Sequence, residues 1–530
     1  MKRIIVLIIT ITLAATLRLV VLNRRPAGFT WDEAALGYNA YSLLKSGRDE
    51  YGKVLPIVFK SFGDYKPGLY VYFTVPSIAT FGLNEFATRL PSAVVGVLLI
   101  AVVFFWAREL VGVPAALLTS LSLAINPWAI HFSRGAWEAN LALFLTTLGG
   151  VLFSKKRYLL AVVFLGLTMW TYQGAKLFTP LILIALIIVY RPQLNFRRLV
   201  GATVLGLGFL LPIILGWGGQ SGRLKVFSVF AYRRSEEAIS QILHQDKLSI
   251  KNRQFYLFHG ESYDQLRAVV HRFSNYFSPY FLFFAGDWTN GRHAIPYFGY
   301  FYPVEILTLV WGGYCLIRRP SRSQLIIWLW LILAPLPAAL SRDVISGVRS
   351  LTLVIPLTLL SGMGWAQVAR HKYVSLVCVA AMLFLVIYFL DLYFIHSPYF
   401  TAPDWLAAYG PALQLVKQHV DEYQKVVITN QLGQPYIFTL FYLQVDPRMY
   451  QSQAQLVENT LGDVGQVTKF GKFEFRPIYV PAEMGVRPTL LVGGQTELTQ
   501  QQLVGIPNLV RLGEFNYPNN TVGLKVVGLK

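Results

Sequence analysis

An aspartate and a glutamate stand side by side in residues 29–38, as Asp32 and Glu33. Thr30 and Glu33 have the spacing of a capping box, so this segment predicts the start of a helix that Gly47 would end. Asp32 then has two compatible roles. It could simply favour the helix dipole, or it could accept the proton of a hydroxyl group that attacks a sugar carbon. A capped helix start would hold such a base rigidly.

A second cluster, in residues 63–70, combines Asp64 and Lys66 with the stiff turn Lys66-Pro67-Gly68. A lysine beside a membrane commonly extends its ammonium group to the surface without any further role. Alternatively, Lys66 neutralises a lipid-linked phosphate, because a fixed cation aimed at an anionic leaving group lowers the barrier to its departure. Asp64 is a candidate for substrate binding.

A third set of ionisable residues falls at turns and in a loop that the helix pattern places on one side of a membrane. Ionisable groups near the ends of membrane helices tend to mark pathways or sites, although Arg349 could also be an interfacial anchor. A zinc site of Asp32, His131 and His293 is conceivable, but no ligand spacing supports it. We assign no cofactor and leave a divalent metal open. The set comprises His131, Arg134, Glu138, Lys176, Asp287, Arg292, His293, Arg342 and Arg349.

The elements that must position these residues are membrane helices. Hydrophobic residues make up 54% of the chain and charged residues 14%, against about 25% charged in a typical soluble domain. Apolar runs of roughly 17–25 residues, enough to cross a bilayer, recur along the chain. We predict about eleven transmembrane helices, near residues 4–22, 89–107, 110–127, 139–153, 157–172, 177–190, 199–216, 302–317, 324–340, 350–366 and 373–395.

The charges between these spans predict their orientation. With a cytoplasmic N-terminus, the short inner loops hold 14 basic residues and one acid, and the short outer loops hold four basic residues. This bias follows the positive-inside rule. It accounts for much of the net charge of +20, and no block of basic residues alternates with aromatics, so we expect no nucleic-acid partner. We expect a multi-pass protein of the cell (plasma) membrane.

Three longer segments, 23–88, 217–301 and 396–530, all fall on the outer side. Residues 1–395 would form the membrane domain, and we expect amphipathic helices at the membrane interface in its two long loops. The first span lacks a small-residue cleavage site, so we expect an uncleaved helix. The only two cysteines, Cys315 and Cys378, lie in apolar spans, which excludes a disulfide framework and a cysteine metal site.

Residues 396–530 have a different pattern, typical of a small extracytoplasmic α/β domain. It carries no phosphate-binding glycine loop, and its position suggests that it covers the site or binds the acceptor. We predict helices over Asp404–Val420 and Pro435–Leu443, and strands over Lys425–Thr429, Phe473–Val480, Leu490–Val492, Leu509–Phe515 and Val522–Val527.

Several of these motifs, in this order and on this side, resemble the membrane glycosyltransferases of the protein O-mannosyltransferase and aminoarabinose-transferase superfamily. The resemblance covers most of the membrane part, and the tail is similar to bacterial members with an extracytoplasmic C-terminal domain. The motifs are Asp32-Glu33, Tyr65-Lys66-Pro67, Arg89-Leu90-Pro91, the turn His131…Arg134…Glu138, Val426-Val427-Ile428-Thr429 and Leu440-Phe441-Tyr442.

The resemblance implies the C-type glycosyltransferase fold and an inverting transfer from a polyprenyl-phosphate-linked sugar to a lipid, glycan or protein acceptor. Asp32 would be the catalytic residue, and Glu33 would position it or the acceptor. Lys66, with Arg134 and Arg349, would bind the donor phosphate. Many relatives have Lys-Pro-Pro where this chain has Gly68, so we expect a looser turn here.

Two other functions remain open on the sequence. A transporter or flippase of lipid-linked sugars would also place charges among helices and bind phosphate, but it would more often show an internal repeat with paired broken helices, and we find none. A sensor or scaffold that binds through its tail would leave Asp32 and Glu33 as no more than helix caps. Substrate contacts are expected from Asp64, His131, Glu138, Arg292 and His293.

Overall fold

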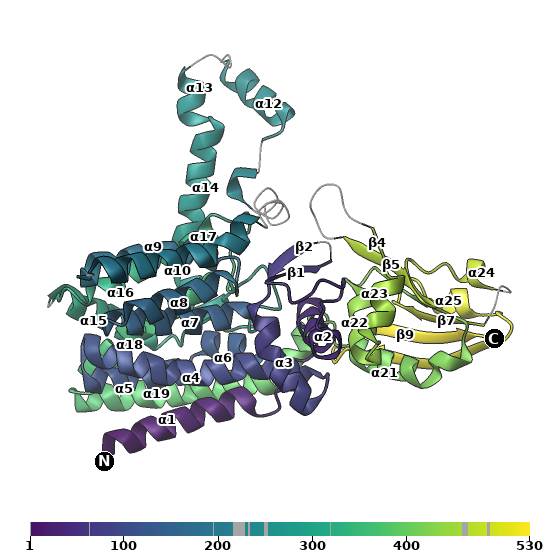
Figure 1. The fold of residues 1–530 in the computed structure, drawn as a ribbon, viewed down its shortest axis with the longest axis horizontal. Coiled ribbons are helices and arrows are strands. Elements are labelled where there is room, and N and C mark those ends of the chain that lie inside the picture. The colour runs from purple at the N-terminus through teal and green to yellow at the C-terminus, as the bar shows by residue number, and fades with distance from the viewer. Residues whose placement is uncertain are drawn as a thin grey trace.

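A computed structural model describes residues 2–62, 64–193, 195–215, 228–231, 234–247, 253–318, 320–457, 465–484 and 488–530. Its helices pack side by side in a bundle, and a β-sheet with its own helices lies beyond one end of that bundle (Figure 1). We call residues 409–530 the sheet unit. The first long loop lies between the bundle and the sheet unit, and the helices of the second long loop project from the side of the bundle (Figure 1).

A helix occupies each of the predicted spans, although several are shorter than a full crossing. Four described helical stretches, 85–111, 196–215, 351–368 and 372–401, are long and apolar enough to span a membrane, and α5 with α6 (Pro127–Arg134), bent by 52°, makes a fifth. The number eleven stays a prediction. The helices are α1 Lys2–Leu19, α4 Glu85–Val111, α5 Val113–Ile125, α7 Glu138–Ser154, α8 Tyr158–Met169, α9 Ala175–Tyr190, α10 Phe196–Leu215, α15 Glu305–Arg318, α16 Leu325–Leu333, α17 Leu336–Ala339, α18 Val354–Val368 and α19 Lys372–Asp391.

Glycines allow the helices around α18 to approach closely. A Cβ placed on Gly312 would lie 1.9 Å from the Leu360 carbonyl oxygen, and one on Gly364 would lie 1.9 Å from that of Thr308. Because lipid tails are as apolar as leucine, membrane helices associate through close packing, and small residues at the contact make it possible. Any larger residue at these two positions would push α15 and α18 apart.

Two buried arginines satisfy helix ends inside the bundle. Arg18 of α1 donates to the carbonyls of Leu123 and Ala124 at the end of α5, at 3.2 and 2.9 Å. Arg134 of α6 donates to the carbonyls of Leu17 and Val20 at the end of α1, at 2.7 and 2.8 Å. The last carbonyls of a helix have no partner within that helix, so each arginine completes an element far away in sequence.

The first long loop contains α2 (Trp31–Ser46), the hairpin β1 (Val58–Ser61) and β2 (Asp64–Pro67), and α3 (Leu69–Phe81). The second contains α12 (Glu236–Asp246), α13 (Arg253–Phe258), α14 (Glu261–Asn275) and a π-helix over Tyr280–Ala285. Exposed apolar side chains at Tyr263, Leu266 and Val270 follow one side of α14, which agrees with the predicted amphipathic pattern. Its position at a membrane interface stays a prediction.

The sheet unit is a seven-stranded mixed sheet in the order β4-β5-β6-β3-β7-β9-β8, with β3 parallel to both β6 and β7. The predicted helix over Pro435–Leu443 is confirmed as α22. The predicted helix from Asp404 begins later, as α21 (Tyr409–His419), because residues 402–408 form turns. The remaining elements are β3 Lys425–Ile428, α23 Pro447–Gln453, β4 Gln455–Val457, β5 Gln466–Phe470, β6 Phe473–Phe475, α24 Val480–Glu483, β7 Thr489–Gly493, α25 Gln500–Leu503, β8 Leu509–Asn516 and β9 Val522–Leu529.

The predicted strand Phe473–Val480 is therefore too long. Only its first three residues pair, as β6, because Pro477 has no amide hydrogen for a further ladder bond and Val480 opens a helix. The unit packs against the first loop through α22: the Phe441 ring lies 4.7 Å from that of Phe29. The division of the chain into domains at residue 395 stays a prediction.

Candidate active site

Asp32 is the second residue of α2, and α2 lies between the bundle and the sheet unit (Figure 1). The predicted capping box is confirmed, because the Thr30 hydroxyl accepts from the Glu33 amide and the Glu33 carboxylate accepts from the Thr30 amide. The Asp32 side chain is 36% exposed and pairs with the Lys66 ammonium group; its second oxygen lies 4.0 Å from the Arg292 guanidinium. The helix start thus presents a solvent-accessible carboxylate between two cations.

Glu33 faces the interior, with only 3% of its side chain exposed. One oxygen accepts from Arg89 Nε and from the Ala136 amide, at 2.8 and 2.9 Å. The other accepts from Arg89 Nη2 and from the Thr30 amide, at 3.0 and 3.1 Å. This buried pairing fixes Glu33 in the first turn of α2, and its role in positioning Asp32 stays a prediction.

Lys66 reaches Asp32 from the β1–β2 hairpin, with its ammonium group 4.8 Å from the Phe62 ring centre. The looser turn expected at Gly68 is not observed: its amide donates to the Ile57 carbonyl at 2.9 Å, and a Cβ there would lie 2.0 Å from the Phe59 ring. Glycine here allows tight packing that a larger residue would prevent. The backbone of Asp64 pairs with Ser61 at the tip of the hairpin, and its side chain lies outside the described structure.

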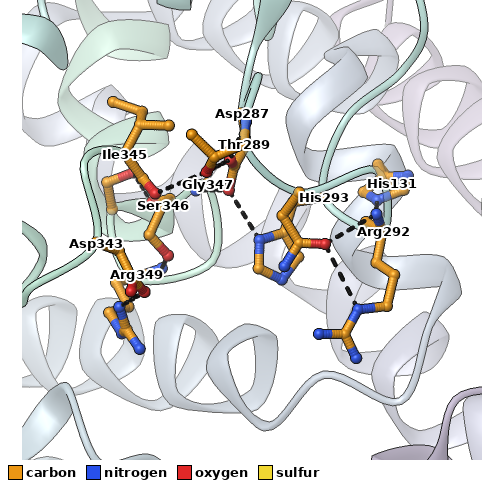
Figure 2. Close-up of polar contacts among 12 residues, drawn as sticks. His131, Asp287, Thr289, Arg292, His293, Asp343, Ile345, Ser346, Gly347 and Arg349 are labelled. Atoms are coloured by element: carbon orange, nitrogen blue, oxygen red, sulfur yellow. Dashed lines mark hydrogen bonds and ion pairs between the residues drawn. The ribbon is translucent and has the colours of Figure 1, made fainter. Parts of the chain in front are cut away.

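Arg292 comes from the second long loop. Its guanidinium carbon lies 4.9 Å from the Trp31 ring centre, where cation and ring attract each other. The buried His131 donates from Nε2 to the Arg292 carbonyl at 2.8 Å (Figure 2). Two predicted substrate-binding residues therefore meet, but in different roles, because His131 holds the backbone of the residue whose side chain faces Asp32.

On the other side of the same segment, Asp287 and His293 form a buried pair. Asp287 Oδ2 lies 2.8 Å from His293 Nδ1 and also accepts from the Gly347 amide at 2.9 Å, while Oδ1 accepts from Thr289 (Figure 2). Burial lowers the pKa of His293 below its ordinary value, and the Asp287 charge opposes this only in part. Burial raises the pKa of Asp287, but its hydrogen bonds outweigh burial and leave the pKa lowered. The pair is a neutral imidazole oriented by a carboxylate.

A cavity of about 810 Å³ opens beside this pair. Its walls come from α14, the 287–293 segment and the 342–346 turn, and Asp32 does not line it. Basic and acidic side chains alternate around it. They are Arg234, Arg267, Arg272, Arg342, Glu261, Asp264, Asp287 and Asp343.

Two predicted phosphate-binding residues have other partners in the structure. Arg134 is buried and donates to helix-end carbonyls, as described above. Arg349 forms an ion pair with Asp343 and donates to the Ser341 hydroxyl at 3.0 Å (Figure 2). Glu138 is the first residue of α7 and is half-buried. Within the described ranges, no three His, Cys, Asp or Glu side chains are grouped so as to hold a metal ion.

One protein family resembles part of this chain in sequence, and several solved structures resemble it in fold. Residues 65–217 match the family described as dolichyl-phosphate-mannose-protein mannosyltransferase. The structure of ArnT from Cupriavidus metallidurans bound to undecaprenyl phosphate matches with a TM-score of 0.54 and 13% identity, covering 99% of this chain and 98% of ArnT. Its apo form matches equally well, at 14% identity, with 99% and 97% covered. The expected family resemblance is confirmed.

Among other solved structures, the archaeal oligosaccharyltransferase AglB from Archaeoglobus fulgidus, in complex with an inhibitory peptide and a dolichol-phosphate, matches with a TM-score of 0.47 and 13% identity, covering 83% of this chain and 63% of AglB. No curated protein sequence matches significantly. The match to ArnT shows that the chain has the ArnT fold over nearly its whole length.

Several residues of the candidate active site carry no clear signal as site residues in the sequence. Arg89 belongs to the Arg89-Leu90-Pro91 motif, and that motif was the only signal for it. Trp31, beside Asp32, supports Arg292. Asp404 lies against the backbone of Gly291, where a Cβ would meet its carboxylate at 2.0 Å. Nothing in the sequence links Asp404 to a loop more than 100 residues away.

Proposed function

We propose that this protein transfers a sugar from a polyprenyl-phosphate carrier to an acceptor hydroxyl or phosphate group, with inversion at the anomeric carbon. The arrangement that carries this proposal is the half-exposed Asp32 carboxylate held between Lys66 and Arg292. A base and two cations in one accessible place are the groups that such a transfer needs. The acceptor class is taken up in the next subsection.

In this reaction the acceptor oxygen attacks the anomeric carbon of the donor from the face opposite the carrier. The acceptor hydroxyl gives its proton to the Asp32 carboxylate as the new carbon–oxygen bond forms. The bond between the anomeric carbon and the phosphate oxygen breaks, and its electron pair leaves with the polyprenyl phosphate. Lys66 and Arg292 stabilise the negative charge that develops there, and Asp32 later returns its proton to water.

A lipid carrier agrees with three features. The fold is shared with ArnT, which binds undecaprenyl phosphate. Asp32 belongs to α2, which lies between the helix bundle and the sheet unit, so a donor anchored among apolar helices could present its phosphate there. The charge bias of the short loops predicts that this end of the bundle faces the extracytoplasmic side of the plasma membrane.

The test measures transfer of label from radiolabelled polyprenyl-phosphate sugars in membranes that contain the wild type or Asp32→Asn. Asparagine keeps the size of the side chain while removing the base, so transfer should fall by about 10²- to 10⁴-fold. Asp421→Asn is the matched control, because Asp421 is a fully exposed carboxylate of the sheet unit, 3.6 Å from a lysine.

Undiminished transfer by a folded, normally abundant Asp32→Asn variant would refute the role of Asp32. If the wild type transfers from no donor and instead moves lipid-linked sugar across vesicle membranes, the protein is a flippase and the proposal is wrong.

A further inference from the structure

The loops that follow the parallel strands of the sheet unit carry uncharged polar side chains. Asn430 Nδ2 donates to Gln466 Oε1 at 3.3 Å, and the Thr496 hydroxyl donates to Gln431 Oε1 at 3.4 Å. Gln431, Gln466 and Thr496 are exposed. We call Asn430, Gln431, Gln434, Gln466 and Thr496 the amide cluster.

The cluster carries no exposed charge. Residues 429–434 and 465–468 contain no Asp, Glu, Lys or Arg, and residues 494–499 contain only Glu497. Glu497 is buried, and its oxygens accept from the amides of Ile478 and Gly494. Within the described parts of these three segments, a charged ligand would therefore find no exposed counter-ion.

The position of the cluster in the sheet is typical of a ligand site. The first strand in sequence, β3, lies at the centre; the chain then forms β6 on one side of it and β7 on the other. In open sheets with parallel strands, ligands bind outside the carboxyl ends of the strands where the strand order reverses in this way. The Gln431–Thr496 contact joins the loops that leave β3 and β7 at that point.

The same loops touch the candidate active site twice. Gly433, two residues after Gln431, packs so closely on Trp31 that a Cβ there would lie 2.7 Å from the ring. The Gly465 amide, next to Gln466, donates to the carbonyl of Phe62, whose ring supports Lys66. The cluster therefore borders Asp32 and Lys66 on the side of the sheet unit.

We infer that the amide cluster binds the acceptor and that the acceptor is an uncharged carbohydrate chain. An amide offers two N–H donors and a carbonyl acceptor, so two amides that share one hydrogen bond still present groups of both kinds to sugar hydroxyls. Trp31 links the cluster to the base, because its ring packs on Gly433 and the next residue in the chain is Asp32. This inference rests on the proposed function, since it supplies the acceptor for that transfer.

The test is binding of uncharged hexasaccharides to the full-length protein in lipid nanodiscs, which avoids sugar-headed detergents. Saturation-transfer NMR would be recorded with maltohexaose, cellohexaose, chitohexaose and mannohexaose. At least one should bind to the wild type. Gln431→Ala combined with Thr496→Ala should weaken that binding by about tenfold or more, because each change removes hydrogen bonds to the ligand.

Gln424→Ala is the matched control, since Gln424 is an exposed amide at the amino end of the same strand, β3. It should bind the hexasaccharide as the wild type does. Binding that survives the double variant, or failure of all four hexasaccharides while an uncharged serine-rich peptide binds, would overturn the inference.

Asp32→Asn separates this inference from the proposed function. It should abolish sugar transfer and leave hexasaccharide binding intact, because Asp32 is the base and not part of the amide cluster. If the wild type binds a hexasaccharide but has no transferase activity, the proposed function is wrong. If it transfers sugar to a peptide but to no saccharide, only the inference about the acceptor is wrong.

Discussion

Two aspartates pair with neighbouring residues of the second long loop: Asp32 lies near Arg292, and Asp287 pairs with His293. Asp32, Lys66 and Arg292 form the open cluster, where the carboxylate is 36% exposed. Asp287, His293 and Gly347 form the closed cluster, where the carboxylate is 1% exposed and accepts hydrogen bonds at both oxygens. The difference teaches that an acid–histidine pair such as Asp287–His293 can have a structural role, while the more exposed pair of Asp32 and Lys66 is accessible to a substrate. Four predictions test this contrast.

The largest effect should come from Glu33, the buried support of the open cluster. Glu33→Gln removes the charge of the carboxylate that pairs with the fully buried Arg89 guanidinium. Breaking a buried pair by removing one partner costs about 3–5 kcal/mol. Thermal unfolding in detergent should show a large loss of stability, whereas Asp32→Asn should unfold near the wild-type temperature. If the two variants were equally stable, Glu33 would not be the structural support of the open cluster.

Lys66 should affect turnover more than folding. Lys66→Met keeps much of the side-chain length but removes the cation, so kcat for sugar transfer should fall by about 10²- to 10³-fold. Lys66→Arg should recover part of the rate because it restores the charge. Full activity of Lys66→Met would show that its ammonium group does not act on the leaving group.

His293 of the closed cluster should make the free energy of unfolding depend on pH. The pKa of His293 is lowered in the folded state. Below a pH of about 6.5, the ordinary pKa of histidine, the unfolded chain therefore binds more protons than the folded chain. The free energy of unfolding then falls as the pH drops further. In His293→Gln this fall should be reduced. The check is the unfolding temperature between about pH 7 and 5, with His419→Gln, a histidine of the sheet unit, as the control; an unchanged slope would contradict the assignment.

Arg349 should have the smallest effect. Its ion pair with Asp343 is half-exposed, and such pairs contribute about 0–1 kcal/mol. Arg349→Gln should change transfer by no more than about threefold and should leave the unfolding temperature nearly unchanged. A loss as large as that of Lys66→Met would instead restore Arg349 to the donor site expected from the sequence.

Local patterns in the sequence predicted much of this molecule. The Thr30–Glu33 spacing gave the start of α2, apolar runs located the helices, and α22 was predicted to the residue, because these features depend on neighbours along the chain. Asp32 and Lys66 were expected in one loop, and they do meet. The partners of Arg134 and Arg349 were not predictable, since the composition of a turn does not reveal which distant carbonyl or acid an arginine reaches.

The crossed arginines, Arg18 and Arg134, also constrain how the protein is made. Carbonyls at the end of α1 accept from Arg134, more than 100 positions later, and carbonyls at the end of α5 accept from Arg18, which is synthesised earlier. When helices enter the membrane one by one, Arg18 is inserted before its carbonyl partners on α5 have been synthesised. Its charge is then near lipid or the insertion machinery. The hydrogen bonds at the end of α1 are complete only once Arg134 of α6 has been synthesised, so this part of the bundle cannot reach its final structure before then.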